Sequence, residues 1–132
     1  MSTNYEVEIE PFAERYYIKT FAKKYKKAWD FTLSALIREF KSFDVILEKT
    51  IAEEISDKNL DVVICKTEFK ISGTQESRHS SGNRCIVAKY KKINKIRVLL
   101  VYHKNNLGGG NETSNWKKFI KNNYPEYKDL LQ

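Results

Sequence analysis

The spacing of the apolar residues changes from a helical to a strand period near Asn59, and this change restricts the chain to a mixed architecture. Upstream, one side of a helix is apolar through Trp29, Leu33, Leu36, Ile37 and Phe40. Downstream, β-branched residues dominate the segments 60–72, 84–90 and 95–103. A chain divided in this way predicts the α+β class, with helices packed on a sheet.

The first 60 residues predict a strand followed by a helical hairpin. Residues 5–10 alternate between apolar and charged side chains, which is typical of a strand with one wet face. Pro11 ends that strand and suits the first turn of a helix. Apolar residues then recur at helical spacing from Phe12 to Tyr25, so this helix and the helix of residues 29–40 form a hairpin near Lys26.

The remaining boundaries come from turn residues and from weaker periodicity. In the segment 43–59, Leu47, Ile51 and Ile55 repeat every four residues and favour a short helix. Residues 73–82 are polar and predict a loop, and residues 92–95 predict a hairpin turn. The predicted last helix spans residues 111–123, after three glycines and before Pro125.

Length and composition indicate one globular domain, residues 1–132. Apolar residues make up 41% of the chain and aromatic residues 13%, which is enough for a core without a disulfide. Cys65 and Cys85 are therefore expected to be buried thiols, and no spacing resembles a zinc site. The sequence has no apolar run long enough to span a membrane, and Met1–Glu6 do not resemble a signal peptide. We expect a cytoplasmic protein with no membrane contact.

Positive charge is concentrated in one part of the chain. The formal net charge is +7, and the stretch 63–105 holds ten Lys and Arg against two Glu. Such an excess attracts a polyanion, although a solvated basic face without a partner is the alternative. From this stretch we expect contacts with RNA from Lys66, Arg78, Lys89, Lys104 and Tyr90.

Strand alternation predicts which of these side chains share a face of the sheet. Along 84–90, one face receives Arg84, Ile86, Ala88 and Tyr90. Along 95–103, strict alternation groups His103 with Arg97, Leu99 and Val101, and it places Tyr102 opposite. A β-bulge would swap this assignment.

The polar residues suit cleavage of RNA without a metal ion. The two histidines are far apart in sequence and have no carboxylate cluster beside them, so no metal site and no cofactor are expected. Cleavage requires a base for the 2′-hydroxyl proton, an acid for the leaving oxygen and cations for the phosphate charge. We assign acid–base chemistry to His103 and phosphate binding to Arg84.

Other side chains are assigned to the RNA itself, each with a simpler alternative. Lys70, Lys89 and Lys104 are candidates for the backbone or the transition state, and Tyr90 and Tyr102 for stacking on bases. The alternatives are an exposed histidine at a strand end, an Arg84 paired with an acidic neighbour, and tyrosines that only pack. His79 lies in a serine-rich loop and is expected to be solvated.

Several short motifs, taken in order, resemble the RelE branch of the RelE/ParE superfamily of bacterial toxins. They are Lys66–Ile71, Ser81–Val87, Val98–Lys104, Trp116–Lys118 and Asn123–Tyr127. The resemblance covers the second half of the chain closely. It implies a small antiparallel sheet with a mixed edge, an N-terminal helical hairpin on one face and a C-terminal helix.

The resemblance also implies a function and site residues. It implies the toxin of a type II toxin–antitoxin system, a metal-independent mRNA endoribonuclease that acts at the ribosomal A site through the RNA 2′-hydroxyl. An acidic antitoxin would be its partner. The matching positions are Arg84, Lys70 and the pair Tyr102–His103. Ser72 stands where the family has a second lysine, and the loop 73–81 is longer than usual, so the general base stays open.

The sequence is therefore compatible with three hypotheses about the function. In the first, an endoribonuclease places Arg84 and His103 in one cleft lined by Lys70 and Lys104. In the second, a toxin of the same fold binds DNA gyrase without cleaving RNA. In the third, the chain is an inactive RNA-binding module.

Overall fold

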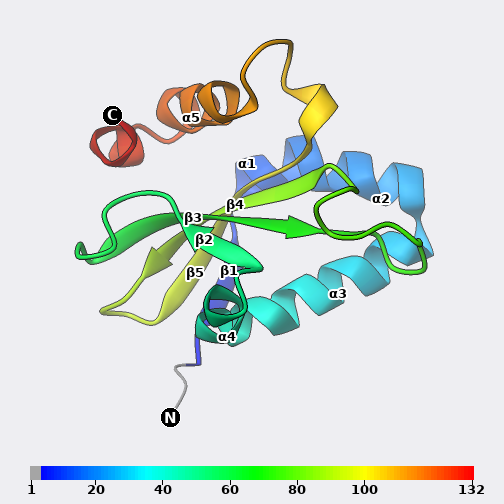
Figure 1. Ribbon diagram of the computed structural model, residues 1–132, viewed down its shortest axis with the longest axis horizontal. Helices are drawn as coiled ribbons and strands as arrows, with labels where there is room; N and C mark the ends of the chain where they lie inside the picture. Colours follow the sequence, from blue (N-terminus) through cyan, green and yellow to red (C-terminus); the bar gives the residue numbers. More distant parts are fainter. Residues whose placement is uncertain (1–3) are drawn as a thin grey trace.

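The computed structural model describes residues 4–132, apart from the side chains of Tyr16 and Tyr17, and forms a five-stranded sheet with helices on both faces (Figure 1). The strands are β1 (Glu6–Ile9), β2 (Ala52–Glu54), β3 (Val62–Phe69), β4 (Asn83–Tyr90) and β5 (Lys95–His103). The α-helices are α1 (Pro11–Ala13), α2 (Lys19–Tyr25), α3 (Lys27–Lys41), α4 (Phe43–Glu48) and α5 (Glu112–Asn123). Other helical turns are the π-helical η1 (Glu14–Ile18) and the 3-10 turns η2 (Lys104–Asn106) and η3 (Pro125–Leu131).

The sheet confirms the predicted α+β class with its mixed edge. Its strand order is β1-β5-β4-β3-β2, with β1 parallel to β5 and every other pair antiparallel. Because β4 and β5 are antiparallel, the start of β4, which follows the loop 73–82, lies beside the end of β5 at one end of the sheet. Both candidate sites described below lie at this end.

The helical hairpin packs on the first face of the sheet, as the sequence predicts. The reversal at Lys26, which adopts a φ of 53°, allows α2 and α3 to run side by side. Phe21 of α2 stacks on Trp29 of α3 with ring centroids 4.9 Å apart. Together they cover strand residues such as Cys85 and Val87, which are fully buried. Burial raises the pKa of the Cys65 thiol on this face to about 12.

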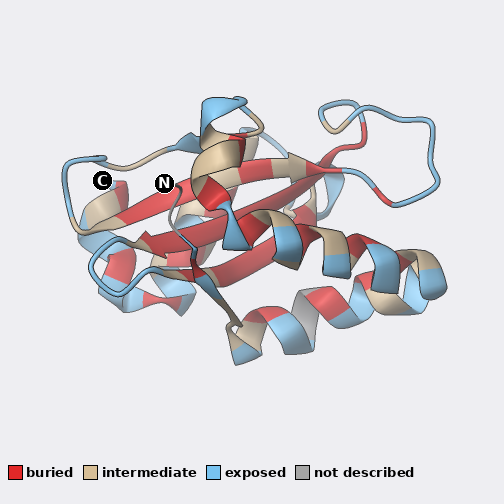
Figure 2. Ribbon diagram, turned by 90° about the horizontal axis from the view of Figure 1, so that it is seen from below, coloured by how far each residue is buried: buried red, intermediate tan, exposed pale blue. Residues whose placement is uncertain are grey.

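The second face of the sheet is also covered, by α5 and η3. Trp116 and Ile120 of α5 are fully buried against strand residues, and Tyr127 and Leu131 of η3 extend this second core. Asn111 caps α5 by accepting a hydrogen bond from the Ser114 amide at 3.0 Å. Figure 2 shows the consequence, in that the inner strands β3, β4 and β5 are buried along most of their length while the helices expose their outer sides.

A β-bulge in β5 overturns the predicted alternation of faces. The register passes from Ile86↔Leu100 directly to Val87↔Val98, so Leu99 is an extra residue. Leu99 and Leu100 both pack into the second core, whereas Val101 packs into the first. From Leu100 to His103, each side chain lies on the face opposite to the one that strict alternation predicts. Strict alternation was therefore wrong for Val101 and His103, which lie opposite Arg97.

Three short elements, β2, η2 and η3, were not predicted, and the helix predicted after residue 43 was too long. The predicted helix after residue 43 is confirmed only as α4, and Ile51 and Ile55 lie outside it. The edge strand β2 was missed because it has three residues, two of them glutamates. The turn η3 begins at Pro125, the residue that was predicted to end the last helix, and nothing was predicted after it. Within residues 4–132 no helix has the length and apolar character to cross a bilayer.

We predict that the second core contributes strongly to stability. Trp116→Ala should lower the free energy of unfolding by about 3–5 kcal/mol, because it removes a fully buried indole. Phe31→Ala is the matched control, since this ring is 67% exposed, and it should change the same quantity by less than about 0.5 kcal/mol. Urea unfolding followed by circular dichroism measures both. Equal losses would mean that α5 is not part of the core.

Candidate functional site

Three of the sequence-predicted residues, Lys66, Arg84 and Tyr102, meet at one end of the sheet, on the face that carries α5. Glu68, Arg84 and Tyr102 are register partners across β3, β4 and β5, so their side chains point to the same face. Lys66 lies two residues before Glu68 on that face. We call this group the arginine cluster, and its members are Lys66, Glu68, His79, Arg84, Tyr102 and Glu112.

Arg84 is a buried cation at the centre of the arginine cluster. Its side chain is 4% exposed, and its Nη1 lies 3.0 Å from Glu68 Oε2 while its Nε lies 3.6 Å from Glu112 Oε2. The guanidinium also donates to the main-chain oxygens of Asn83, at 3.1 Å, and His79, at 3.3 Å. A buried charge needs such partners to offset its lost hydration. The pairing with acidic neighbours, an alternative left open by the sequence, is therefore present.

Glu112, the first residue of α5, connects the cations of the cluster. Its Oε2 accepts a hydrogen bond from the Tyr102 hydroxyl at 2.8 Å and lies 3.2 Å from Lys66 Nζ. Burial alone would raise the pKa of Glu112, but Tyr102, Lys66 and Arg84 outweigh it and hold that pKa below the ordinary value of 4.5. A carboxylate in the first turn of a helix is also favoured by the helix dipole.

Tyr102 can donate a hydrogen bond but cannot act as a base near neutral pH. It is buried in the second core, and burial, followed by the hydrogen bond to Glu112, raises the pKa of its hydroxyl far above the usual range. The predicted stacking of Tyr102 on a base is wrong for this arrangement, because its ring is covered by protein. Its predicted catalytic role remains a prediction.

His79 and Glu68 form a pair that the sequence analysis missed. The Nδ1 of His79 lies 2.7 Å from Glu68 Oε2, the same oxygen that binds Arg84, yet the imidazole is 84% exposed. The expectation that His79 is solvated is confirmed by this exposure, and the contact with Glu68 is the part that was not predicted. Its loop is fixed beside β3 because the Ser81 hydroxyl contacts the main-chain oxygens of Phe69, at 2.6 Å, and Arg78, at 2.7 Å. Glu68 could have been identified from the sequence, because strand alternation and pairing bring it to the same face as Arg84. No feature of the sequence indicates that His79 lies beside it.

His103 does not join Arg84, and the expectation that both line one cleft was wrong. The register partner of His103 is Asn83, whereas that of Arg84 is Tyr102. Consecutive residues of a strand point to opposite faces, so His103 lies on the face that carries α2. It lines a cleft there with Phe21 and Tyr25.

The other predicted RNA contacts do not gather at one site, and one of them is buried. Lys70 and Lys104 are exposed and lie outside the arginine cluster, and Arg78 pairs with Glu39 of α3 at 2.6 Å. Lys89 is buried on the first face, 3.2 Å from Glu54. None of these four contacts Arg84 among the interactions of residues 4–132.

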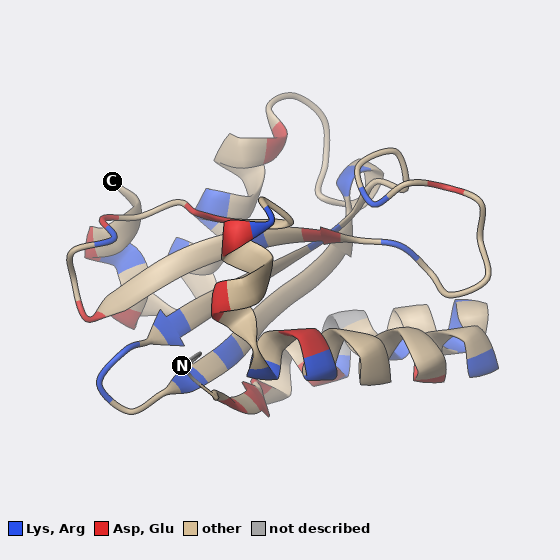
Figure 3. Ribbon diagram, turned by 60° about the horizontal axis from the view of Figure 1, so that its bottom comes forward, with Lys and Arg blue, Asp and Glu red and all other residues tan. Residues whose placement is uncertain are grey.

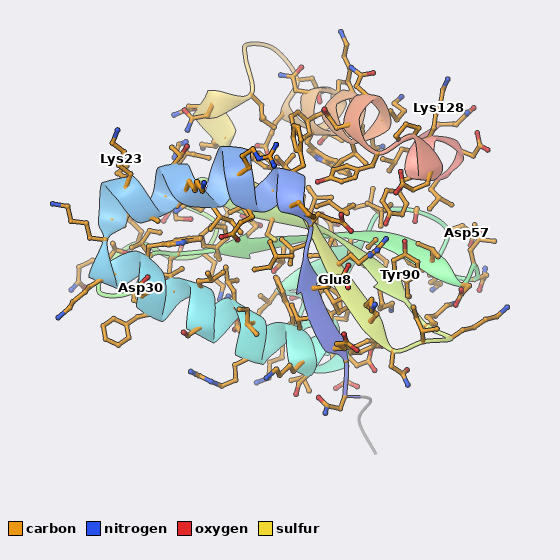
Figure 4. All side chains as sticks on the ribbon, turned by 180° about the vertical axis from the view of Figure 1, so that it is seen from behind. Glu8, Lys23, Asp30, Asp57, Tyr90 and Lys128 are labelled. Atoms are coloured by element: carbon orange, nitrogen blue, oxygen red, sulfur yellow. The ribbon has the colours of Figure 1, made fainter. Side chains whose placement is uncertain are left out.

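Tyr90 packs at the far end of β4, away from Arg84. Its hydroxyl lies 2.6 Å from that of Tyr127, and the guanidinium of Arg97 lies 5.6 Å from the centre of its ring. Arg97 in turn binds Glu8 at 3.2 Å. Figure 4 shows Glu8 and Tyr90 near one another on this side of the sheet. Stacking of Tyr90 on RNA therefore finds no support in its position.

Ion pairs reduce the field of the basic stretch. Six of its ten cations are paired with carboxylates, and they are Lys66, Arg78, Arg84, Lys89, Lys95 and Arg97. Figure 3 shows acidic residues interspersed with the basic ones. Among residues 4–132, no group of three His, Cys, Asp or Glu side chains is arranged to hold a metal ion. The arginine cluster is therefore a local site rather than part of a wide basic face.

Comparison with known proteins identifies the fold. No protein-family model matches the sequence, and no curated protein matches it. The structure is similar to a chain of the archaeal RelE–RelB complex from Pyrococcus horikoshii OT3, with a TM-score of 0.52 and 12% sequence identity. The match covers 79% of this chain and 99% of that chain. The protein has a RelE-like fold. At this identity the likeness is one of fold, and the function of the RelE-like chain rests on its own residues.

We predict that Glu112 stabilises the fold only while it is ionised. Because its pKa is lowered by folding, its contribution is present above its ordinary pKa of 4.5 and is lost as the pH falls through the lowered value. At pH 7, Glu112→Gln should reduce the free energy of unfolding by about 1 kcal/mol. The wild type and the variant should converge in strong acid.

Thermal unfolding of both proteins from neutral pH to strong acid tests this prediction. Glu126→Gln, on the exposed side of η3, is the control and should show a small, pH-independent effect. A Glu112→Gln effect of constant size across the pH range would contradict an ionic role for this carboxylate.

Proposed function

We propose that this RelE-like protein is a metal-independent endoribonuclease that cleaves single-stranded mRNA, and that it is the toxin of a type II toxin–antitoxin system. The observation that carries the proposal is the arginine cluster, in which a buried guanidinium shares a carboxylate with an exposed imidazole. This combination provides charge for a phosphate and a group that exchanges protons, at the edge of one site. The proposal includes action in the cytoplasm, on mRNA in the ribosomal A site.

The proposed reaction is an internal transfer of the phosphate. The RNA 2′-oxygen attacks the adjacent phosphorus and the bond to the 5′-oxygen breaks, leaving a 2′,3′-cyclic phosphate and a 5′-hydroxyl. Arg84 and Lys66 would stabilise the charge on the phosphate oxygens. The Nε2 of His79 would take the proton from the 2′-hydroxyl and give it to the leaving 5′-oxygen, while Glu68 holds the Nδ1 of the same ring. Tyr102 would donate a hydrogen bond.

Access to Arg84 requires Glu112 to leave the cluster. A phosphate carries the same sign of charge as this carboxylate and offers similar acceptor oxygens, so it can replace Glu112 between Lys66 and Arg84. Gly108 and Gly110, which precede α5, have φ values of 93° and 90°. They connect η2 to α5 through a segment whose backbone can change direction. Movement of the first turn of α5 is therefore part of the proposed binding step.

The proposed partner is an acidic antitoxin. The similar archaeal structure is a complex of RelE with RelB. The present chain has a formal net charge of +7, which favours an acidic protein as a binding partner. Co-purification with a small acidic protein encoded beside this chain, and relief of growth arrest by it, would support this part of the proposal.

The arginine cluster predicts a specific order among variants in RNA cleavage. Arg84→Ala and His79→Ala should each lower the single-turnover rate on translated mRNA about 100-fold or more, because they remove the phosphate ligand and the proton-exchanging group. His103→Ala should lower it much less, because His103 lies on the other face. A 2′-deoxy nucleotide at the cleavage position should abolish cleavage, because the attacking oxygen is then missing.

Lys128→Ala serves as the control, since Lys128 points into solvent from η3 (Figure 4). A larger loss from His103→Ala than from His79→Ala would contradict the proposed assignment. Inhibition of DNA supercoiling without RNA products would favour a gyrase-binding toxin. Salt-dependent RNA binding without products would favour an inactive binding module.

A further inference from the structure

The cleft that His103 lines lies on the opposite face of the sheet from the arginine cluster. Its volume is about 490 Å³, and it opens between α2, the loop 73–82 and the segment from the end of β5 into η2. Six of its lining residues carry the argument, namely Phe21, Tyr25, Asn83, His103, Asn105 and Asn106. No step of the proposed cleavage reaction uses this cleft.

The strongest indication of a ligand is an acceptor without a partner. Asn83 is 3% exposed, and among residues 4–132 its Oδ1 is buried without a hydrogen-bond partner. A buried amide oxygen in this state destabilises the fold, so such groups are rare in proteins. Ser81, which also lines the cleft, is fully engaged with main-chain groups. Asn83 lines the cleft, and its Oδ1 is an acceptor that no donor of the described residues satisfies.

His103 places a donor beside this acceptor. Asn83 and His103 are direct register partners on β4 and β5, and both side chains line the cleft. The Nδ1 of His103 accepts a hydrogen bond from the Asn105 amide at 3.1 Å, which leaves the proton of the neutral ring on Nε2. The ring lies against Gly82, where an added Cβ would be 2.5 Å from Nε2. Gly82 thus leaves the space that the ring occupies.

The wall of the cleft suits a planar ring. Phe21 and Tyr25 are stacked, with centroids 6.1 Å apart and planes inclined by 23°. The lining contains one cation, Lys24, and one carboxylate, Glu76, so it has no net formal charge. The ammonium of Lys24 lies 5.2 Å from the centre of the Tyr25 ring. A flat, uncharged ligand that displaces this ammonium, and that has adjacent N–H and acceptor groups on its edge, would satisfy both the aromatic surface and the polar pair.

We propose that this cleft binds a nucleobase. Each of the four RNA bases has a donor and an acceptor side by side on one edge, and its flat faces can stack on an aromatic side chain. The base would donate to Asn83 Oδ1 and accept from His103 Nε2. It can come from a free nucleotide or from an unpaired base of an RNA strand. Binding does not require the cleavage activity proposed above.

Binding of defined probes separates the two sources. The probes are the four nucleoside 5′-monophosphates, ribose 5-phosphate, and short single-stranded oligonucleotides with 2′-O-methyl groups, which block cleavage through the 2′-oxygen. Titration calorimetry and the NMR signals of the His103 imidazole report binding to the full chain. We expect at least one monophosphate or oligonucleotide to bind and shift the His103 signals. Ribose 5-phosphate has a phosphate for the arginine cluster but no base, and it should leave the His103 signals unchanged.

Variants test whether the polar pair makes the contact. Asn83→Ala and His103→Ala should each weaken binding of the base about tenfold. Asn83→Ala should not lower the melting temperature, because its Oδ1 has no protein partner to lose. Asn59→Ala, in the exposed turn at the other end of β3, is the control and should leave affinity unchanged. Arg84→Ala should also retain binding of monophosphates, which separates this site from the arginine cluster.

The outcomes are decisive in either direction. Binding of monophosphates identifies a free nucleotide as sufficient, and binding of oligonucleotides alone identifies an RNA strand as the source. Absence of binding by every probe would overturn the proposal. Affinity unchanged in both Asn83→Ala and His103→Ala, or an equal shift of the His103 signals by ribose 5-phosphate, would also overturn it.

Discussion

The burial of Arg84 is the interaction on which the arrangement of this end of the sheet depends. A guanidinium in the centre of a sheet that is covered on both faces is tolerated only when its charge is matched. Glu68 from β3 and Glu112 from α5 match it, and through them His79 and Lys66 are held nearby. The same charge thus fixes a loop and the start of a helix, and it is the proposed ligand for phosphate.

The bulge at Leu99 separates two sites that the sequence had merged. With strict alternation, the end of β5 would present His103 on the face of Arg97. The extra residue gives Leu99 and Leu100 to the second core and turns His103 towards α2. The cluster around Arg84 and the cleft at Asn83 consequently lie on opposite faces, although these two residues are adjacent in the chain. The same end of the sheet therefore carries the arginine cluster on one face and the cleft at Asn83 on the other.

Much of the fold was predictable from the sequence, because periodicity reports burial directly. The hairpin at Lys26 and the last helix follow from apolar spacing that the structure confirms. The bulge was not predictable, since residues 98–101 are all apolar and fit either face. Of the candidate site, Arg84, Lys66 and Tyr102 were identified. His79 was missed because its position depends on hydrogen bonds of Ser81 that only the folded loop makes.

A crystal structure of the protein with a non-cleavable, 2′-O-methylated single-stranded RNA tests the central claim most directly. The account predicts that a phosphate lies within hydrogen-bonding distance of Arg84 and Lys66, that Glu112 has left both cations, and that His79 faces the adjacent 2′-oxygen. RNA bound elsewhere on the surface, with Arg84 still paired to both Glu68 and Glu112, would contradict the account.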